Sequence, residues 1–236
     1  MPKKEKVRQM FDGIAGDYDR LNHIMSLDVD KTWRYRALRE IVVPGVTRVL
    51  DLACGTGDFS IAIARRMRRL GQPGHVTGVD LSEGMLAVMK EKVGREGLQD
   101  MISMQAGDGE NLPLGTGTFD RVTIAFGIRN FEDRAKGLRE MLRVLKPGGK
   151  LVVLELSVPE NPVLRWCYNL YFMHILPLIG SGVSGDKAAY HYLPSSVQHF
   201  PKHREFLNEM RAAGFNAVAH KAFTFGICRM FVGTKA

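Results

Sequence analysis

Apolar residues along the middle of the chain follow two alternating patterns. Short, almost continuous apolar runs predict buried strands, and longer stretches with helical apolar spacing predict amphipathic helices. The strands are predicted at Val46 to Leu52, His75 to Val79, Met101 to Ala106, Phe119 to Ala125, Lys150 to Leu156, Asn216 to Lys221 and Thr224 to Gly233. The helices are predicted at Phe59 to Leu70, from the N-cap Ser82 to about Arg95, and at Asp133 to Leu145. This alternation predicts an α/β fold with a doubly wound, mostly parallel seven-stranded sheet and helices on both faces.

Two segments flank the alternating core at 46–160. Lys3 to about Ile41 has a helical pattern, which predicts an N-terminal helical cap over 1–45. A segment rich in aromatic residues and histidine, 161–212, separates the fifth strand from the C-terminal strands at 213–236 and is expected to be a helical insertion. Because no repeat or linker interrupts the chain, we expect residues 1–236 to form a single domain.

The composition is that of a globular protein, with 45% hydrophobic and 25% charged residues. The N-terminus is charged, and no apolar signal segment follows it. The most apolar stretch, Pro162 to Gly180, is interrupted by Arg165, Asn169, His174 and Pro177, so no transmembrane helix is predicted. The three cysteines lack metal-ligand spacing, and we therefore expect a cytoplasmic protein without a metal.

The net charge of +8 allows for nucleic acid, anionic lipid or no specific partner. The densest basic cluster, Arg65 to Arg69, falls at the end of a predicted helix, where cations complement the helix dipole. Basic residues do not interleave with aromatic residues along one predicted groove, and we expect no nucleic-acid partner.

The most informative motif is the loop within Val49 to Phe59, where a buried strand meets a Gly-x-Gly turn and then a helix. Gly55 and Gly57 would let the backbone approach a ligand closely. The dinucleotide fingerprint requires a third glycine, but Ser60 occupies that position. The loop also carries Asp51 and Asp58, which would repel a pyrophosphate and attract the ammonium and sulfonium groups of S-adenosylmethionine.

Two further carboxylates follow the next predicted strands. Asp80 ends the second strand and could accept hydrogen bonds from two ribose hydroxyls. Asp108 follows the third strand and could accept a hydrogen bond from an adenine amino group, while Met85 and Leu86 could cover the adenine face. The alternative is that each aspartate only caps the next helix or turn, but the ordered set favours a cofactor site.

With these motifs, the chain resembles the menaquinone and ubiquinone biosynthesis C-methyltransferases, which are class I S-adenosylmethionine-dependent methyltransferases. The residues that carry the resemblance, besides the Gly-x-Gly loop, are Met10 to Asp19, Leu21, Asn22, Ser26, Trp33, Arg34, Gly107 to Pro113, Phe126 to Asn130, Arg143 to Gly149, Leu154 to Ser157, Pro159, His174 to Pro177 and Tyr190 to Leu193. They span nearly the whole chain.

The resemblance implies that the core at 46–160 binds the cofactor and that the insertion at 161–212 covers the substrate. It places cofactor contacts at Thr56, Asp80, Asp108 and Gly109. Some members of the family have a serine just before the Phe-Gly-hydrophobic-Arg-Asn segment, and here that residue is Ala125. Any hydroxyl contact with the cofactor would be lost at this position.

The implied reaction moves a methyl group from a sulfonium to a ring carbon of a prenylated quinol. The carbon becomes nucleophilic when a neighbouring hydroxyl ionises, so the site must favour the phenolate. Arg129 is the candidate for stabilising it electrostatically, because an arginine is a poor base. Asn130, Tyr18 and Asp108 are candidates for orienting a water molecule and moving the proton. The alternative for Arg129 is a surface salt bridge to Glu132 or Asp133.

The apolar segment Leu164 to Ile179 is expected to form the wall of a channel for the lipid tail. The alternative is an ordinary core helix, since Trp166, Leu170, Met173 and Leu176 recur near helical spacing. His174 would more often be a core histidine than a base.

The expected substrate is demethylmenaquinol, with the ubiquinone precursor, a methoxy-benzoquinol, as an alternative. Transient contact with the inner face of a membrane and a homodimer are further expectations. The competing hypotheses are methylation of another small molecule such as a sterol or phenol, methylation of nucleic acid, and cofactor binding without catalysis.

Overall fold

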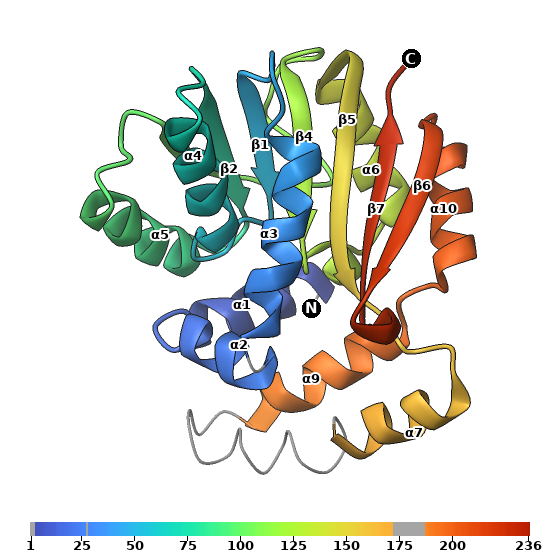
Figure 1. Ribbon diagram of the computed structural model, residues 1–236. Coiled ribbons are helices and arrows are strands. Elements are labelled where there is room, and N and C mark those ends of the chain that lie inside the picture. Colours follow the sequence, from blue (N-terminus) through green and yellow to red (C-terminus); the bar gives the residue numbers. More distant parts are fainter. Residues whose placement is uncertain (1–2, 27, 172–186) are drawn as a thin grey trace.

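Within residues 3–26, 28–171 and 187–236, which the computed structural model describes, seven strands form one sheet at the centre of the molecule (Figure 1). The strands are β1 (Arg48–Leu52), β2 (His75–Asp80), β3 (Ile102–Ala106), β4 (Phe119–Ala125), β5 (Leu145–Leu156), β6 (Asn216–Phe223) and β7 (Cys228–Thr234). Their order is β3-β2-β1-β4-β5-β7-β6, and β7 runs antiparallel to both of its neighbours while the other pairs are parallel. The predicted doubly wound, mostly parallel sheet is confirmed.

The strand order reverses beside β1. Leu52 of β1 pairs with Val79 of β2 on one side and with Ile124 of β4 on the other. The loops that follow these three strands therefore meet at one end of the sheet. Ligands of open α/β sheets bind at such a switch point, outside the carboxyl ends of the strands.

Five helices cover the two faces of the sheet among the described residues. They are α3 (Val29–Ile41), α4 (Asp58–Arg69), α5 (Glu83–Arg95), α6 (Arg134–Val144) and α10 (His203–Ala212). The first three pack on one face, where Met67 and Met89 are fully buried. The other two pack on the opposite face, where Leu138 and Phe206 are fully buried. Since burial of a large apolar side chain contributes about 1.5–3 kcal/mol, both layers hold the sheet in place.

The remaining helices lie beyond the carboxyl ends of the parallel strands (Figure 1). They are α1 (Lys3–Ile14), α2 (Tyr18–Ser26), η1 (Ile128–Asn130), α7 (Pro162–Leu170), α9 (Lys187–Gln198) and η3 (Thr224–Gly226). The indole Nε1 of Trp33 in α3 donates to Thr224 Oγ1 at 2.8 Å. Segments from both ends of the chain thus enclose the same end of the sheet. None of the described helices is long and apolar enough to cross a bilayer.

Most of the predicted element boundaries agree closely with the structure, and two are wrong. β5 begins at Leu145 rather than Lys150, because Leu145 pairs with Phe119 of β4 before the register shifts. The last strand begins at Cys228 rather than Thr224, because the chain first makes the turn η3. The predicted N-cap Ser82 is confirmed, since its Oγ accepts from the Met85 amide at 3.1 Å.

Candidate active site

The loop after β1 has the sharp turns that its glycines predict. Gly55 and Gly57 have φ angles of 55° and 84°, in the left-handed region. A Cβ atom on Gly57 would lie 2.4 Å from Cγ of Met89, so a side chain is excluded by sterics as well as by conformation. Gly57 is also the N-cap residue of α4, which begins at Asp58. The loop therefore presents bare backbone and a helix N-terminus at the switch point.

Asp80, at the end of β2, is tied to this loop. Its Oδ2 accepts from the Gly55 amide at 2.8 Å, and its Oδ1 accepts from the Ser82 amide at 2.8 Å. Burial raises the pKa of the Asp80 carboxyl, and these backbone hydrogen bonds oppose the shift. A carboxylate has about four lone-pair positions, so both oxygens keep acceptor capacity for a ligand.

Asp108 lies in the loop after β3 and contacts the N-terminal helix α1. Its Oδ2 accepts from Lys4 Nζ at 2.7 Å, and its Oδ1 accepts from the Glu110 amide at 2.9 Å. Burial raises the pKa of Asp108, but Lys4 and the Glu110 amide outweigh it, and the net pKa is lowered. The neighbouring Gly109 packs against Phe131, whose Cζ would lie 2.6 Å from an added Cβ. Asp108 is therefore held in its ionised form, next to the close contact between Gly109 and Phe131.

These residues surround a cavity of about 90 Å³, the first cavity. Among its lining residues are Gly55, Asp80, Asp108, Gly109, Ala125 and Asn130. Met85 lines it as predicted, but Leu86 packs into the core between α5 and the sheet, which corrects the expectation that both cover one ligand face. Consecutive residues of a helix point about 100° apart, so only one of the two can face the cavity.

A smaller third cavity of about 30 Å³ adjoins the first and is lined by Arg34, Asp51, Gly55, Thr56 and Asp58, among others. Asp51 is 1% exposed, and its Oδ2 accepts from Ser60 Oγ at 2.6 Å. Burial raises the pKa of Asp51 to about 7, although the hydrogen bond from Ser60 opposes the shift. Such a carboxyl would be stabilised in its ionised form by a cationic ligand group.

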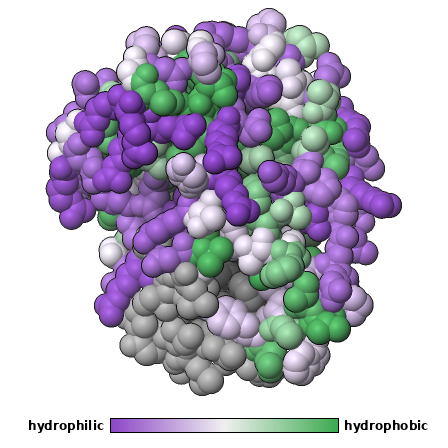
Figure 2. Space-filling view, in the orientation of Figure 1, coloured by the Kyte–Doolittle hydropathy of each residue, from purple (hydrophilic) through white to green (hydrophobic). Residues whose placement is uncertain are grey.

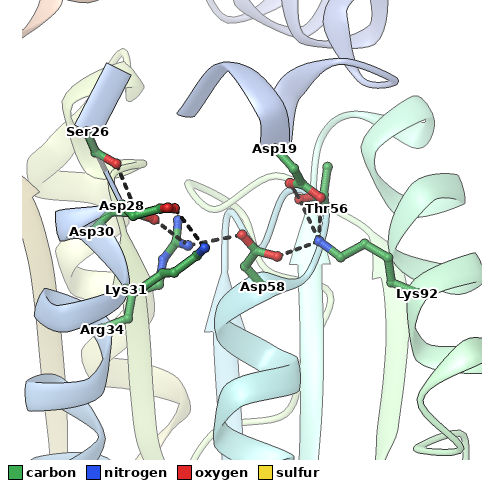
Figure 3. Close-up of polar contacts among 9 residues, drawn as sticks. All are labelled: Asp19, Ser26, Asp28, Asp30, Lys31, Arg34, Thr56, Asp58 and Lys92. Carbon is green, nitrogen blue, oxygen red and sulfur yellow. Dashed lines mark hydrogen bonds and ion pairs between the residues drawn. The ribbon is translucent and has the colours of Figure 1, made fainter. Parts of the chain in front are cut away.

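A polar network joins the cap helices to this third cavity (Figure 3). Thr56 Oγ1 donates to Asp19 of α2, and Lys92 of α5 forms ion pairs with Asp19 at 2.6 Å and with Asp58 at 2.5 Å. Arg34 of α3 contacts Asp58 through Nη1 at 3.1 Å. The predicted cofactor residue Thr56 is therefore buried and fixed by the cap.

Arg34 has donor capacity left over at this site. Its Nη1 also pairs with Asp30 at 2.9 Å, and its guanidinium lies 5.5 Å from the ring centre of Phe126. Its Nε is buried and has no hydrogen-bond partner among the residues that the structure describes. A buried N–H group without a partner is costly, which points to a ligand or water acceptor at this position.

The second cavity is larger, about 350 Å³, and is lined mainly by apolar and aromatic side chains. Its walls come from α2, α3, α7 and η3 and include Val29, Trp33, Leu156, Leu164, Tyr168 and Ile227. The start of the predicted channel wall, Leu164 to Tyr171, contributes four residues to this lining. The rest of that wall, including Met173, His174 and Leu176, lies outside the described residues.

Tyr18 and Phe126 line all three cavities and form their common wall. Phe126 follows β4 directly and has a φ of 60°, an uncommon value for a residue with a side chain. Burial raises the pKa of the Tyr18 hydroxyl, so Tyr18 stays neutral and able to donate at neutral pH. Groups bound in the first and second cavities would meet at these two residues.

Arg129 lies in η1 and borders the second cavity, where it is 7% exposed. Its Nη1 pairs with Glu155 Oε1 at 2.7 Å and also donates to the Phe126 carbonyl. The alternative of a surface salt bridge to Glu132 or Asp133 is wrong, because the partner is the fully buried Glu155 of β5. Burial lowers the pKa of Arg129, but Glu155 outweighs it and the net shift is upward.

Asn130 follows Arg129 and faces the first cavity. Its Oδ1 accepts from the Tyr192 hydroxyl of α9 at 2.9 Å. The two neighbouring residues thus face different cavities, and each is held by a partner from another element. The structure describes the Tyr192 side chain but not those of Tyr190 and His191, so this part of the predicted motif is only partly described.

The sequence profile of one protein family, the ubiE/COQ5 methyltransferase family, matches residues 1–235. The chain belongs to this family. The demethylmenaquinone methyltransferase of Bacteroides fragilis is 42% identical over 233 residues, which cover 99% of this chain and 94% of that protein. The ubiquinone/menaquinone biosynthesis C-methyltransferase UbiE of Geobacter sulfurreducens is 45% identical over 233 residues, covering 99% and 90%. The predicted family and the predicted reaction class, methyl transfer from S-adenosylmethionine, are confirmed.

The fold of this member of the ubiE/COQ5 family also occurs in solved methyltransferase structures. An S-adenosylmethionine-dependent methyltransferase of Thermotoga maritima superposes with a TM-score of 0.66 at 19% identity, covering 97% of this chain and 99% of that chain. A likeness at this level of identity supports the fold alone.

Two residues of the ubiE/COQ5 family member gained a role only in the structure. Arg34 and Glu155 belong to segments that carry the family resemblance, but the sequence indicates no function for either residue. A carboxylate in the apolar run Leu151 to Leu156 was a usable signal, because a buried charge requires a partner. No comparable local signal marked Arg34, whose partners come from α3, α4 and the loop after β4.

Proposed function

We propose that the protein methylates a ring carbon of a prenylated quinol, with demethylmenaquinol as substrate and S-adenosylmethionine as methyl donor. The observation that carries this proposal is the pair of adjoining cavities, one rimmed by carboxylates and one lined by apolar side chains, with Tyr18 and Phe126 between them. The polar methyl donor, in the first cavity, and the hydrophobic quinol that accepts the methyl group, in the second, would meet at that wall. The names of the relatives, which include demethylmenaquinone methyltransferases from several bacteria, support the choice of substrate.

The residues around the first cavity suit the adenosine part of the cofactor. Asp80 would accept from the ribose hydroxyls, and Asp108 with Gly109 would contact the adenine. Gly55 and Gly57 leave room for close approach of the backbone. When bound, the cofactor supplies an electrophilic methyl group on a sulfonium.

The third cavity suits the amino-acid part of the cofactor. Its ammonium would be attracted to Asp51, close to Thr56. Its carboxylate needs a cation, and the unpartnered Nε of Arg34 offers a charged donor at this place. A carboxylate and a guanidinium are therefore both present to match the ammonium and the carboxylate of an amino acid.

For the acceptor, the chain must lower the pKa of a ring hydroxyl, which is about 10 for a phenol such as tyrosine. Arg129 lies in the second cavity with a fixed charge, which would stabilise the phenolate and so activate the neighbouring carbon. Asn130, oriented by Tyr192, and Tyr18 would hold the ring hydroxyl or a water molecule that takes its proton. Asp108 lines the first cavity and is bound by Lys4, so we assign it to the cofactor rather than to the proton path.

Methylation assays with purified protein test the proposal. The protein is incubated with S-adenosylmethionine and either reduced demethylmenaquinone or the demethylated methoxy-benzoquinol, each with the same short prenyl tail, and the products are analysed by mass spectrometry. We expect a product one methyl group heavier from the naphthoquinol. Methylation of the benzoquinol alone would identify the ubiquinone precursor as the substrate. No methylation of either quinol by folded, cofactor-binding protein would contradict the proposal.

A further inference from the structure

Helix α7 has apolar side chains on two sides. One side faces the second cavity and includes Leu164 and Tyr168. The other side carries Val163, Trp166 and Leu170, which are 69%, 66% and 43% exposed. Their spacing of three and four residues places them in one stripe along the helix. The helix is therefore not an ordinary amphipathic one, because its outward side is as apolar as its inward side.

A second exposed aromatic residue borders the same cavity. Phe225 lies at the tip of η3, is 79% exposed and belongs to the cavity lining. Because Phe225 and α7 border the same cavity, we group Phe225 with the stripe and call Val163, Trp166, Leu170 and Phe225 the α7 face. Hydrophobic residues gather at the lower right of the molecule in Figure 2, over α7. An exposed apolar patch beside a cavity marks an interaction site.

We propose that the α7 face docks on the surface of a lipid bilayer and turns the second cavity toward the lipid. This inference rests on the proposed lipophilic substrate, which partitions into the bilayer. Trp166 is a tryptophan, which is enriched where apolar and aqueous environments meet. Phenylalanine and leucine are typical of the buried side of interfacial helices, as Phe225 and Leu170 would be here. A helix with one side on the cavity and the other in the interface would let a prenyl tail pass between them without crossing water.

The size of the α7 face favours lipid over a second copy of the chain. At these exposed fractions, the four side chains together offer on the order of 500 Å². A stable dimer interface needs about 800 Å² from each partner. An interfacial helix, by contrast, needs only a shallow apolar stripe and a favourable charge.

The charge of the protein complements an anionic bilayer. The chain has a net charge of +8, and the exposed Arg165 lies on α7, on a different side of the helix from the stripe. The Arg165 guanidinium donates to the carbonyls of Pro159 at 3.1 Å and Glu160 at 2.8 Å. A guanidinium has five N–H donors, so exposed donors remain for a lipid phosphate.

Tryptophan fluorescence offers a direct test, because the chain has two tryptophans in different surroundings. Trp33 is 4% exposed, whereas Trp166 is 66% exposed. On addition of vesicles of phosphatidylglycerol and phosphatidylcholine, we expect the emission to shift to shorter wavelength and to be quenched by brominated lipid. Both effects should disappear in Trp166→Phe. Unchanged emission of Trp166 in vesicle-bound protein would overturn the proposal.

Vesicle co-sedimentation provides the second measurement. We expect the double variant Trp166→Ser with Leu170→Ser to bind at least about tenfold more weakly than the parent protein, equivalent to about 1.4 kcal/mol. The matched control is Leu70→Ser, since Leu70 is 54% exposed at the end of α4, at the opposite end of the sheet, and should bind as the parent does. Parent-like binding of the double variant would overturn the proposal, as would a dimer of the parent that the double variant loses.

Measurements of methylation in solution and in vesicles distinguish a failure of membrane docking from a failure of the proposed substrate. The double variant should methylate a short-tailed quinol in solution at the parent rate, and should lose activity only toward a long-tailed quinol embedded in vesicles. If the parent methylates no quinol but Trp166 still enters the bilayer, the proposed substrate fails and the docking surface stands. Equal loss of activity in solution and in vesicles would contradict docking as the role of this face.

Discussion

The first and second cavities share Tyr18 and Phe126 but are built in opposite ways. The carboxylates and glycines of the first lie in short motifs, in the loops that follow β1, β2 and β3, although α1 and Tyr18 also line it. The second is assembled from α2, α3, α7 and η3, which are distant in sequence and meet only in the folded chain. The comparison teaches that a site for a common cofactor can be encoded locally, whereas a site for a particular substrate depends on tertiary packing.

The two cavities also handle charge differently. Carboxylates of the first cavity are compensated by backbone amides and by Lys4, near the surface. In the second cavity, a buried guanidinium and a buried carboxylate, Arg129 and Glu155, compensate each other in an apolar wall. Changes in the first cavity should therefore act on cofactor affinity, and changes in the second should act on the chemical step.

The largest effect is expected for Arg129. Arg129→Met should lower kcat by about 10²–10³-fold, comparable to removal of one oxyanion-stabilising donor, with little change in affinity for the cofactor. With less help in ionising the quinol, the pH–rate profile should move to higher pH. Arg129→Lys should rescue only part of the rate, because a point charge does not reproduce a planar fork of donors. Single-turnover methyl transfer measures the effect.

The structure changes the control for this experiment. Arg129→Met alone leaves Glu155 buried without its partner, which can cost about 3–5 kcal/mol of stability. The double variant Arg129→Met with Glu155→Gln removes both charges and should regain thermal stability but not turnover. Recovery of turnover together with stability would show that Arg129 only neutralises Glu155.

Substitution of Asp80 should change the affinity for the cofactor far more than it changes kcat. Asp80→Ala should weaken cofactor binding by about 1.5–3 kcal/mol, the range for hydrogen bonds to a charged group, with a much smaller change in kcat at saturating cofactor. Asp80→Asn keeps the shape and should retain part of the affinity. Isothermal titration calorimetry measures the binding. An unchanged affinity in folded Asp80→Ala would remove this residue from the cofactor site.

Arg34 should contribute to the binding of only one part of the cofactor, its amino-acid carboxylate. Arg34→Met should bind S-adenosylmethionine about tenfold more weakly, or ~1.4 kcal/mol, because the amino-acid carboxylate loses its cation. Binding of 5′-methylthioadenosine, which lacks the amino-acid part, should be the same in variant and parent. Competition binding of the two ligands makes the comparison within one preparation. Equal losses for both ligands would mean that Arg34 acts on the loop rather than on the carboxylate.

The smallest effect is expected for the pH dependence of cofactor binding. The pKa of Asp51 is raised to about 7 by burial, and the ammonium of the cofactor should lower it in the complex. Binding then releases a proton below this pH, so affinity should rise about fivefold from about pH 6 to about pH 7 and then level off. Titrations in buffers of different ionisation enthalpy count the protons. Asp51→Asn should abolish the release, and an identical release in that variant would assign it to another group.

The cofactor site could be predicted from the sequence because its determinants are local. Gly57 lies in the loop after the first predicted strand and has the positive φ expected of a sharp turn, and Asp80 lies at the end of β2 as predicted. The observed contacts of Asp80 are to the Gly55 and Ser82 amides, and its role toward a ribose stays a prediction. The fold followed from the same alternation of strands and helices. The roles of the predicted site residues stay predictions until the variants are measured.

What could not be predicted depends on contacts between distant segments. The segment from Leu164 was predicted as a channel wall, with a core helix as the alternative because of the helical spacing of Trp166 and Leu170, but these two side chains are exposed. A periodic pattern shows that a helix has an apolar side and does not show what covers it. The partner of Arg129 could not be predicted either, because Glu155 is 26 residues away in the sequence, on β5.

The wall formed by Tyr18 and Phe126 has a consequence for inhibitor design. Because the two cavities are separated only by these side chains, one molecule can occupy both if it links an adenosine to an apolar tail through a short tether. The second half of such a bisubstrate inhibitor would bind at a high effective concentration, and its affinity could exceed that of either half by about 10²–10⁴-fold. Selectivity would come from the tail, since methyltransferases share the adenosine cavity far more widely than they share the walls of the second one.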